Sequence, residues 1–186
     1  MNLSELRSSL PDHAKDLRLN LESVLAETGA PGLSAEQIGM VAIASAIASR
    51  HLPLTAAIEA EFAPRIEAAS ANGARAAAAI MGMTNIYYRF LHLVENPEYE
   101  TLRAGLRMNV LANPGCDKAG FELAAIAVSA INGCGKCIAS HEKVLRAHGI
   151  GAQGVQSAVR IAAVMHAVAV VLEQKAGNPG AFAAAA

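Results

Sequence analysis

The chain has 186 residues, of which 53% are hydrophobic and 17% are charged, and its formal net charge is -1. This composition excludes intrinsic disorder, which combines low hydrophobicity with a large net charge. It also argues against nucleic-acid binding, because no basic tract is present and phosphate backbones are bound by clustered Lys and Arg. Alanine accounts for 41 residues and aromatic residues for only 4%. Since alanine is the strongest helix former, the composition predicts an all-α helical bundle.

No segment is expected to cross a membrane or to direct export. The longest charge-free runs, 123–135 and 161–172, are shorter than the roughly 20 residues that a spanning helix needs. Glu5 and Arg7 interrupt the start of the chain, where a signal peptide would be apolar. We therefore expect a cytoplasmic protein without membrane contact. Three cysteines in that reducing compartment do not form a structural disulfide framework.

Start and stop signals for helices recur along the chain. Ser34, with Gln37 three residues later, forms a capping box. Asp117 can cap a later helix, and Gly133 supplies the left-handed position that ends it. The first thirty residues predict one or two helices, and the Ala-rich tail is expected to fray. The other predicted helices lie at about 34–48, 54–69 (ended by Asn72-Gly73), 74–88, 98–110 (a linking helix), 117–132, 134–148 and 153–173.

Shifting the sequence by 84 residues aligns it with itself in two places. Residues 45–47 (SAI) fall on 129–131 (SAI), and residues 78–81 (AAIM) fall on 162–165 (AAVM). Two matches at one offset indicate an internal duplication. The predicted organisation is a single domain, 1–186, built from two helical repeats at about 34–90 and 117–175.

The two repeats differ in their reactive side chains, which all lie in the second repeat. Residues 132–142 read NGCGKCIASHE and contain Cys134, Lys136, Cys137 and His141, while Glu122 precedes them. At the offset of 84, the partners of Cys134, Cys137, His141 and Glu122 are Arg50, Pro53, Ala57 and Ile38. We therefore expect the chemistry in the second repeat and only the scaffold in the first.

A helix that begins at this motif places Cys134, Cys137 and His141 within about 60° on one face. In an antiparallel hairpin that turns at Gly133, Glu122 and His141 lie about 16 and 12 Å from the turn, at ~1.5 Å per residue. The predicted order along the groove is Glu122, His141, Cys137, Cys134. A carboxylate that orients an imidazole beside a thiol is typical of an activated nucleophile.

Two physical arguments select different cysteines as the nucleophile. The helix dipole favours the thiolate of Cys134, which is nearest the helix N-terminus. His141 follows Cys137 by four residues and can remove its proton directly. We expect Cys137 to be the nucleophile, because the imidazole can act on it directly and the dipole contributes only ~0.3–1 kcal/mol at an exposed site. The other cysteine can trap a sulfenic acid as a disulfide.

The pattern resembles the alkylhydroperoxidase D (AhpD) family of the carboxymuconolactone decarboxylase-like superfamily. The resemblance rests on Glu122, on Cys134-x-x-Cys137-x-x-x-His141, on residues 81–89 (MGMTNIYYR) and on the chain length. It implies an internally duplicated all-α protein, usually a homotrimer, that is an antioxidant peroxidase for alkyl hydroperoxides. It also implies reduction of the alkyl hydroperoxide reductase C peroxiredoxin. The electrons would come from a dihydrolipoyl group on a 2-oxoacid dehydrogenase subunit, recharged by lipoamide dehydrogenase and NADH, with no cofactor bound.

The resemblance also implies a role for each residue of the motif. Cys137 would form the sulfenic acid and the interchain disulfide with the peroxiredoxin. Cys134 would be the proton donor and resolving thiol that closes the Cys134–Cys137 redox disulfide. Glu122 and His141 would form the proton relay. Lys136 departs from members that have His between the cysteines, so it is expected only as an auxiliary charge, because lysine does not shuttle protons readily near neutral pH.

Three alternative interpretations use the same residues. A carboxymuconolactone-type decarboxylase requires no CxxC pair, so the motif argues against it. A non-enzymatic thiol adaptor would pass electrons without reducing peroxide itself. A zinc-stabilised interaction module would use both thiols, His141 and Glu122 as ligands, but structural zinc usually draws on widely separated pairs, so no metal is expected. Cys116 has no base nearby in sequence and is expected to be a bystander.

Overall fold

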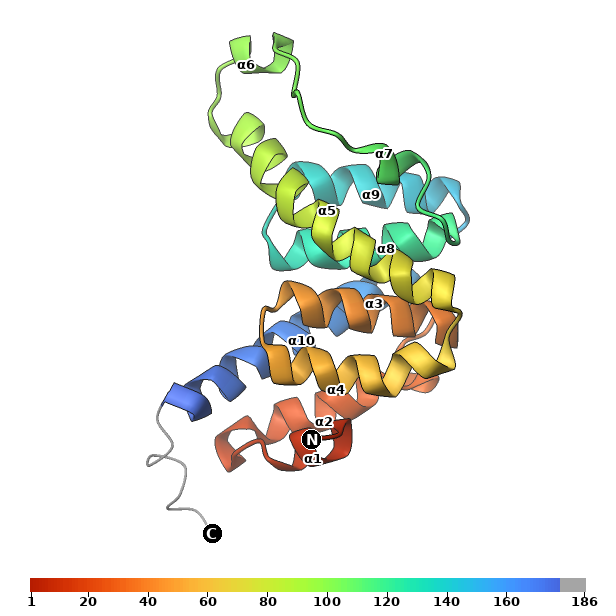
Figure 1. The fold of residues 1–186 in the computed structure, drawn as a ribbon, viewed down its shortest axis with the longest axis vertical. Coiled ribbons are helices and arrows are strands. Elements are labelled where there is room, and N and C mark those ends of the chain that lie inside the picture. The colour runs from red at the N-terminus through yellow and green to blue at the C-terminus, as the bar shows by residue number, and fades with distance from the viewer. Residues whose placement is uncertain (178–186) are drawn as a thin grey trace.

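A computed structural model describes residues 1–177 as a bundle of helices, with no strand in that range (Figure 1). The predicted all-α class is confirmed, whereas the Ala-rich tail that was expected to fray lies outside the described residues. The helices are α1 (Leu3–Ser8), η1 (Asp12–Ala14), α2 (Lys15–Val24), η2 (Glu27–Gly29), α3 (Ala35–Ala48), α4 (Leu52–Phe62), η3 (Ala63–Arg65), α5 (Ala68–Leu93), α6 (Glu98–Thr101), α7 (Asn109–Ala112), α8 (Lys118–Ile131), α9 (Gly135–Ala147) and α10 (Ala152–Gly177).

Four helices form the centre of the bundle. Helices α3 and α8 pack against each other, and α5 and α10 each pack against both of them. Helix α8 is buried at every position from Gly120 to Ser129, and α3 from Ile38 to Ala46. A helix that is apolar on all sides must lie inside the protein. The Glu122 carboxylate therefore projects from the most enclosed part of the fold.

The remaining helices cover the two ends of this centre. Helix α4 packs against α3 and α9 against α8, while α1 and α2 lie at the α4 end (Figure 1). Helix α9 lies at the opposite end, where it packs against α8 and α5 beside the short helices α6 and α7. The cysteine motif is at this second end, because it begins α9.

Helix α10 is long and apolar enough to cross a membrane by length and composition alone. In its most apolar window, however, 56% of the residues are buried inside the bundle. The helix packs against α2, α3 and α8. That packing is typical of the core helix of a globular domain.

The predicted caps are present. Ser34 and Gln37 form a reciprocal capping box at the start of α3, and the Asp117 carboxylate accepts a hydrogen bond from the Gly120 amide at 2.7 Å. Gly133 has φ of 67°, the left-handed conformation that ends α8. The predictions of these boundaries are confirmed. They could be made from the sequence because each boundary depends on a local signal.

Helix bounds recur along the chain at two slightly different spacings. Helices α5 and α10 begin and end 84 residues apart. The N-caps of α3 and α8, Ser34 and Asp117, are 83 residues apart, and so are those of α4 and α9, His51 and Cys134. By helix position the counterpart of Cys134 is therefore His51, not Arg50. The uniform 84-residue register is wrong for the α3–α4 and α8–α9 hairpins, which are 83 residues apart. The duplication itself stays a prediction.

Helix α5 runs unbroken from Ala68 to Leu93, so the break predicted at Asn72-Gly73 is wrong. Gly73 serves close packing rather than termination. A Cβ atom at this position would collide with the Cys116 sulfur. Glycine is needed here because two segments approach each other without room for a side chain.

The predicted helices at 54–69 and 98–110 are also wrong in extent. Helix α4 ends at Phe62 and continues only as the 3₁₀ turn η3, because Pro64 has no N–H to bond to the carbonyl four residues earlier and its ring crowds that carbonyl. The linking segment has only the short helices α6 and α7, separated by irregular chain in which Gly105 has φ of 63°. Residues 94–108, which we call the arm, extend away from the bundle beyond α5 (Figure 1).

We predict that Gly73→Ala lowers the free energy of unfolding by about 1–3 kcal/mol, because the added methyl group overpacks the contact with Cys116. Gly82→Ala is the matched control, since it lies in the same helix with nothing within 4 Å of the new methyl group. The control should stabilise the protein by up to about 1 kcal/mol. Urea unfolding measures both changes, and equal effects of the two substitutions would contradict this packing argument.

Candidate active site

The two cysteines of the motif lie at the start of α9. Cys134 is the N-cap residue, and its sulfur accepts a hydrogen bond from the Cys137 amide at 3.3 Å. The structure joins the two sulfur atoms in a disulfide, with their Cα atoms 5.3 Å apart. Cys134 is fully buried, whereas 6% of Cys137 is exposed. The disulfide therefore presents Cys137 on its outer side.

Cys137 forms part of the wall of a cavity of about 330 Å³ between α5 and α9. This volume is in the range of small-molecule sites. Cys134 is not among the residues that line it. The lining residues are Met81, Thr84, Tyr88, Leu111, Lys136, Cys137, Ser140 and His141.

Glu122 and His141 meet across the α8–α9 hairpin. The Oε2 atom of Glu122 lies 2.6 Å from Nδ1 of His141, and both side chains are largely buried. The contact predicted from the helical rise is therefore present. A carboxylate at this nitrogen fixes the orientation of the imidazole ring, as in other acid–base sites.

Lys118 completes the surroundings of this carboxylate and was missed in the sequence analysis. Its Nζ atom lies 2.8 Å from Oε1 of Glu122 and also donates a hydrogen bond to the Leu111 carbonyl. Lys118 is one turn before Glu122 in α8. The spacing of four residues is visible in the sequence and is the signal that could have identified the pair.

The two hydrogen-bond partners of Glu122 determine its charge. Burial raises the pKa of the Glu122 carboxyl, but hydrogen bonds from His141 and Lys118, together with their charges, outweigh it and lower the pKa below its ordinary value. Glu122 is consequently a carboxylate at neutral pH. It can accept hydrogen bonds on both oxygen atoms.

The other nitrogen of His141 does not face a thiol. Its Nε2 atom lies 3.2 Å from the sulfur of Met81, a buried residue of α5. The predicted direct contact between the imidazole and a cysteine is replaced by this one, although His141 and Cys137 line the same cavity. Met81 has no local signal for such a role, because the contact depends on how α5 packs against α9.

Lys136 and Cys116 lie outside this chain of contacts. The Nζ atom of Lys136 pairs with Glu100 of the arm at 2.8 Å, and this hydrogen bond lowers the pKa of the Glu100 carboxyl. Cys116 is a free cysteine that packs beside Gly73. Burial raises the pKa of the Cys116 thiol, which disfavours the reactive thiolate.

Within residues 1–177, no group of three or more His, Cys, Asp or Glu side chains is placed to hold a metal ion. Glu122 binds both His141 and Lys118 instead.

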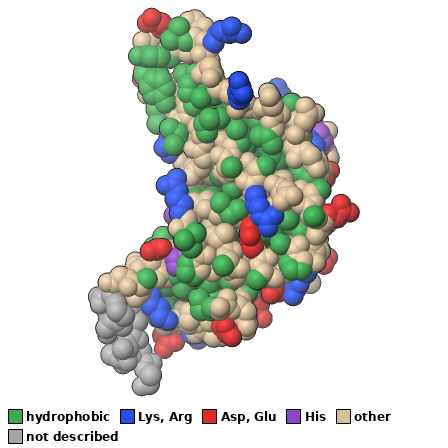
Figure 2. Space-filling model, viewed as in Figure 1, with side chains coloured by type: hydrophobic (Ala, Val, Ile, Leu, Met, Phe, Trp, Pro, Cys, Tyr) green, Lys and Arg blue, Asp and Glu red, His purple; other side chains and the backbone are tan. Residues whose placement is uncertain are grey.

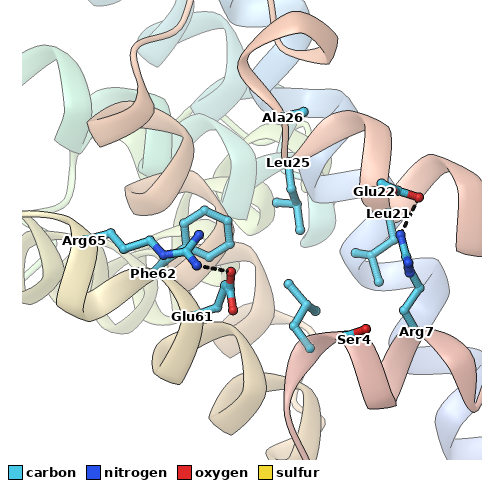
Figure 3. Close-up of a pocket in the computed structure, with 10 residues that line it drawn as sticks. Ser4, Arg7, Leu21, Glu22, Leu25, Ala26, Glu61, Phe62 and Arg65 are labelled. Carbon is cyan, nitrogen blue, oxygen red and sulfur yellow. Dashed lines mark ion pairs between the residues drawn. The ribbon is translucent and has the colours of Figure 1, made fainter.

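A second cavity, of about 300 Å³, lies among α1, α2 and α4 at the opposite end of the bundle (Figure 3). Its charged side chains form two ion pairs, Arg7 with Glu22 and Arg65 with Glu61. No cysteine or histidine lines it. The lining residues are Leu3, Ser4, Arg7, Leu21, Glu22, Leu25, Ala26, Glu61, Phe62 and Arg65. The paired charges and the lack of a cysteine or histidine argue against this cavity. The Cys137 cavity is the candidate active site because a thiol and an imidazole line it together.

The chain is similar over most of its length to known proteins. The sequence model of the carboxymuconolactone decarboxylase family matches residues 97–176, which include α8, α9 and most of α10. A relative from Frankia alni is 51% identical over 173 residues, covering 93% of this chain and 92% of its own length. A relative from Rhodospirillum centenum is 49% identical over 189 residues, with both chains fully covered. A relative from Streptomyces griseus is 49% identical over 176 residues, covering 95% of this chain and 98% of its own.

All three relatives are named alkyl hydroperoxide reductase AhpD. The fold and the family match define a member of the carboxymuconolactone decarboxylase-like superfamily. Within that superfamily, the chain belongs to the AhpD family.

We predict that Glu122→Gln lowers stability at neutral pH by about 1–3 kcal/mol, because His141 and Lys118 lose the ionised acceptor that they share inside the protein. The pKa of Glu122 is lower in the folded chain than the ordinary value of about 4.3. Its contribution to stability is therefore present above about pH 4.3 and is lost as the pH falls through the folded-state pKa.

Urea unfolding of both proteins across the acid range tests this prediction. The difference in unfolding free energy should be constant near neutral pH and should shrink below about pH 4. Glu142→Gln, a half-exposed carboxylate on α9, is the control and should show little difference at any pH. A difference that grows on acidification would show that Glu122 is not stabilised as a carboxylate.

Proposed function

We propose that this protein is an antioxidant thiol peroxidase that reduces alkyl hydroperoxides by cycling Cys134 and Cys137 between dithiol and disulfide. The observation that carries the proposal is the position of Cys137 in the wall of a small-molecule cavity beside the Glu122–His141 pair. The names of its AhpD relatives, alkyl hydroperoxide reductases, support the same activity.

The proposed reaction balances in two steps. The Cys137 thiolate attacks the terminal peroxide oxygen, the O–O bond breaks, and an alcohol leaves after receiving a proton through the Glu122–His141 relay. Cys137 is left as a sulfenic acid. The Cys134 thiol then attacks this sulfur, and water leaves as the Cys134–Cys137 disulfide closes. One hydroperoxide and one dithiol give one alcohol, one water and one disulfide.

The location of each sulfur supports this division of roles. Cys137 lines the cavity and can meet a peroxide, whereas Cys134 is fully buried behind it. The Cys134 sulfur lies at the start of the same helical turn and forms the disulfide with Cys137. Cys137 is for the same reason the sulfur that a peroxiredoxin thiol could reach to form an interchain disulfide.

The proposed reductant of the disulfide is a dihydrolipoyl group on a carrier protein, and the proposed partner is the alkyl hydroperoxide reductase C peroxiredoxin. A lipoyl arm is a flexible apolar chain that ends in two sulfurs. Met81, Tyr88 and Leu111 give the cavity apolar walls and Cys137 is among its lining residues, so its chemistry suits such an arm. We place this cycle in the cytoplasm, where lipoamide dehydrogenase and NADH can recharge the donor.

We predict that cumene hydroperoxide converts the reduced protein to a Cys134–Cys137 disulfide while Cys116 remains free. Alkylation after quenching, followed by peptide mass analysis, locates the modified cysteines. Cys137→Ser should abolish the reaction. Cys134→Ser should stop at the sulfenic acid of Cys137, and Cys116→Ser is the control that should react like the wild type.

Other outcomes assign other functions to the site. If the reduced protein ignores hydroperoxide but exchanges disulfides with dihydrolipoamide and the peroxiredoxin, it is a thiol adaptor and not a peroxidase. If a Cys134→Ser/Cys137→Ser double variant keeps full activity on a carboxymuconolactone, the decarboxylase interpretation replaces the proposal. Bound zinc in the reduced protein would favour the interaction module.

We propose further that the chain assembles as a homotrimer. Large hydrophobic side chains are exposed along the end of α5 and the arm, where Figure 2 shows a concentration of apolar surface. Exposed apolar patches of this kind mark protein interfaces. These side chains are Ile86, Phe90, Leu93, Tyr99, Leu102 and Leu106.

Light scattering should give a mass about three times the chain mass of 19.2 kDa. Leu93→Glu, at a side chain that is 66% exposed, should shift the protein toward smaller species without lowering helix content. Leu19→Glu is the control, because Leu19 is 59% exposed on α2, away from this surface. A monomeric wild-type protein would overturn the assembly but not the chemistry.

A further inference from the structure

The sulfur of Met81 lies in an unusually polar setting for a buried methionine. Four polar atoms surround it: His141 Nε2 at 3.2 Å, Ser129 Oγ at 3.5 Å, and Thr84 Oγ1 and Asn85 Nδ2 at 3.6 Å. Met81 is only 1% exposed. A thioether sulfur can accept hydrogen bonds but has no proton to donate. Any hydrogen bond between one of these atoms and the sulfur must therefore be donated to Met81, which for His141 requires a proton on Nε2.

The hydrogen bonds of the neighbours show which of them hold the sulfur. Asn85 donates to Ser129 Oγ at 2.9 Å and accepts from Asn132 at 2.9 Å, so its amide orientation is fixed. The single Ser129 hydroxyl proton is then directed to the Met81 sulfur. The Thr84 hydroxyl donates to the Ile80 carbonyl at 2.9 Å and only flanks the sulfur. Asn85 and Ser129, both fully buried, thus fix the position of the Met81 side chain.

Met165 shows that this setting is not a general property of core methionines in this fold. It lies 84 residues after Met81, in α10, and is also fully buried. Within residues 1–177 no hydrogen bond reaches its sulfur. Ser45, a fully buried serine of α3, likewise has a hydroxyl with no partner in the described chain. Such a polar cluster therefore surrounds the buried methionine at the α5–α8–α9 end of the bundle, beside the cysteines, and does not surround Met165.

We propose that Met81 is a positioning residue for proton transfer at His141: its sulfur accepts the Nε2 proton and holds the imidazole against the Cys137 cavity. This inference rests on the proposed function. Glu122 fixes the ring at Nδ1, at 2.6 Å, and Met81 fixes it from the opposite side. A rotation of the ring would break these two contacts. Met81, His141 and Cys137 line the same cavity, so the ring is held beside the space in which we propose that the peroxide reacts.

A weak acceptor suits this task. Sulfur accepts hydrogen bonds less strongly than oxygen does, so it orients the Nε2 proton without preventing its transfer. A carboxylate in its place would compete with the leaving alkoxide for the proton. An apolar group would leave the nitrogen without a partner inside a largely buried site.

Met81→Leu tests the proposal, because leucine conserves most of the volume and removes the acceptor. Met165→Leu is the matched control. The first readout is the Nε2–H resonance of His141 in ¹⁵N-histidine-labelled oxidised protein, assigned with His141→Gln. The second is the rate of hydroperoxide-driven disulfide formation as a function of pH. Thermal unfolding of each variant monitors the fold.

We expect a slowly exchanging Nε2–H resonance of His141 in the wild type and in Met165→Leu, and its loss in Met81→Leu. The oxidation rate of Met81→Leu should fall by roughly threefold to tenfold, with an altered pH profile. If Met81→Leu does not fold, Ser129→Ala removes a donor that holds the sulfur, and its control is Ser45→Ala. Ser129→Ala should broaden the same resonance and slow the reaction, whereas Ser45→Ala should do neither.

An unchanged Nε2–H resonance in Met81→Leu overturns the proposal, and so does a rate change that Met165→Leu reproduces. The two readouts also separate this inference from the function on which it rests. If the wild type fails to react with hydroperoxide, the proposed peroxidase activity is wrong, while the resonance in the oxidised protein still decides the role of Met81.

Discussion

An ionised carboxylate, that of Glu122, lies within the most completely buried helix of the bundle. Such a group is tolerated inside a protein only when it is paired and hydrogen-bonded. His141 must therefore be level with it on α9, and Lys118 one turn before it on α8. The contact with His141 fixes the register of the α8–α9 hairpin, in which the disulfide directly follows the turn at Gly133. The geometry of the cysteines is thus a consequence of how one buried charge is compensated.

The parts of this arrangement that follow from local rules could be predicted from the sequence. The caps at Ser34 and Asp117, the turn at Gly133 and the facing of Glu122 and His141 depend on residues close in sequence or on the constant rise of a helix. The contact between Met81 and His141 joins residues 60 positions apart. Nothing local fixes such a contact, because it depends on how α5 packs across α9. Gly73 failed as a stop signal for the same reason, since its small size meets a tertiary need at Cys116.

The α8–α9 hairpin carries the reactive side chains, whereas the α3–α4 hairpin has only packing contacts. By cap position, Glu122 corresponds to Gly39, where a side chain would collide with Ile66 of the neighbouring segment. The first hairpin therefore has no room for a buried carboxylate, and its core closes with apolar contacts. The second hairpin opens to a cavity instead, because Met81, Leu111 and Tyr88 leave space above Cys137. The difference between the halves lies in available volume as much as in residue identity.

Cys134 and its counterpart His51 have the same structural role, which is unrelated to redox chemistry. Each follows a left-handed residue, and each accepts a hydrogen bond from the amide three residues later: His51 through its ring nitrogen, Cys134 through its sulfur. The first turn of α9 thus depends on an acceptor at position 134. Serine at this position retains an acceptor, whereas alanine leaves the amide of Cys137 without one. Alanine and serine variants of Cys134 are therefore not interchangeable probes, because alanine removes a thiol and also loosens the helix that carries Cys137 and His141.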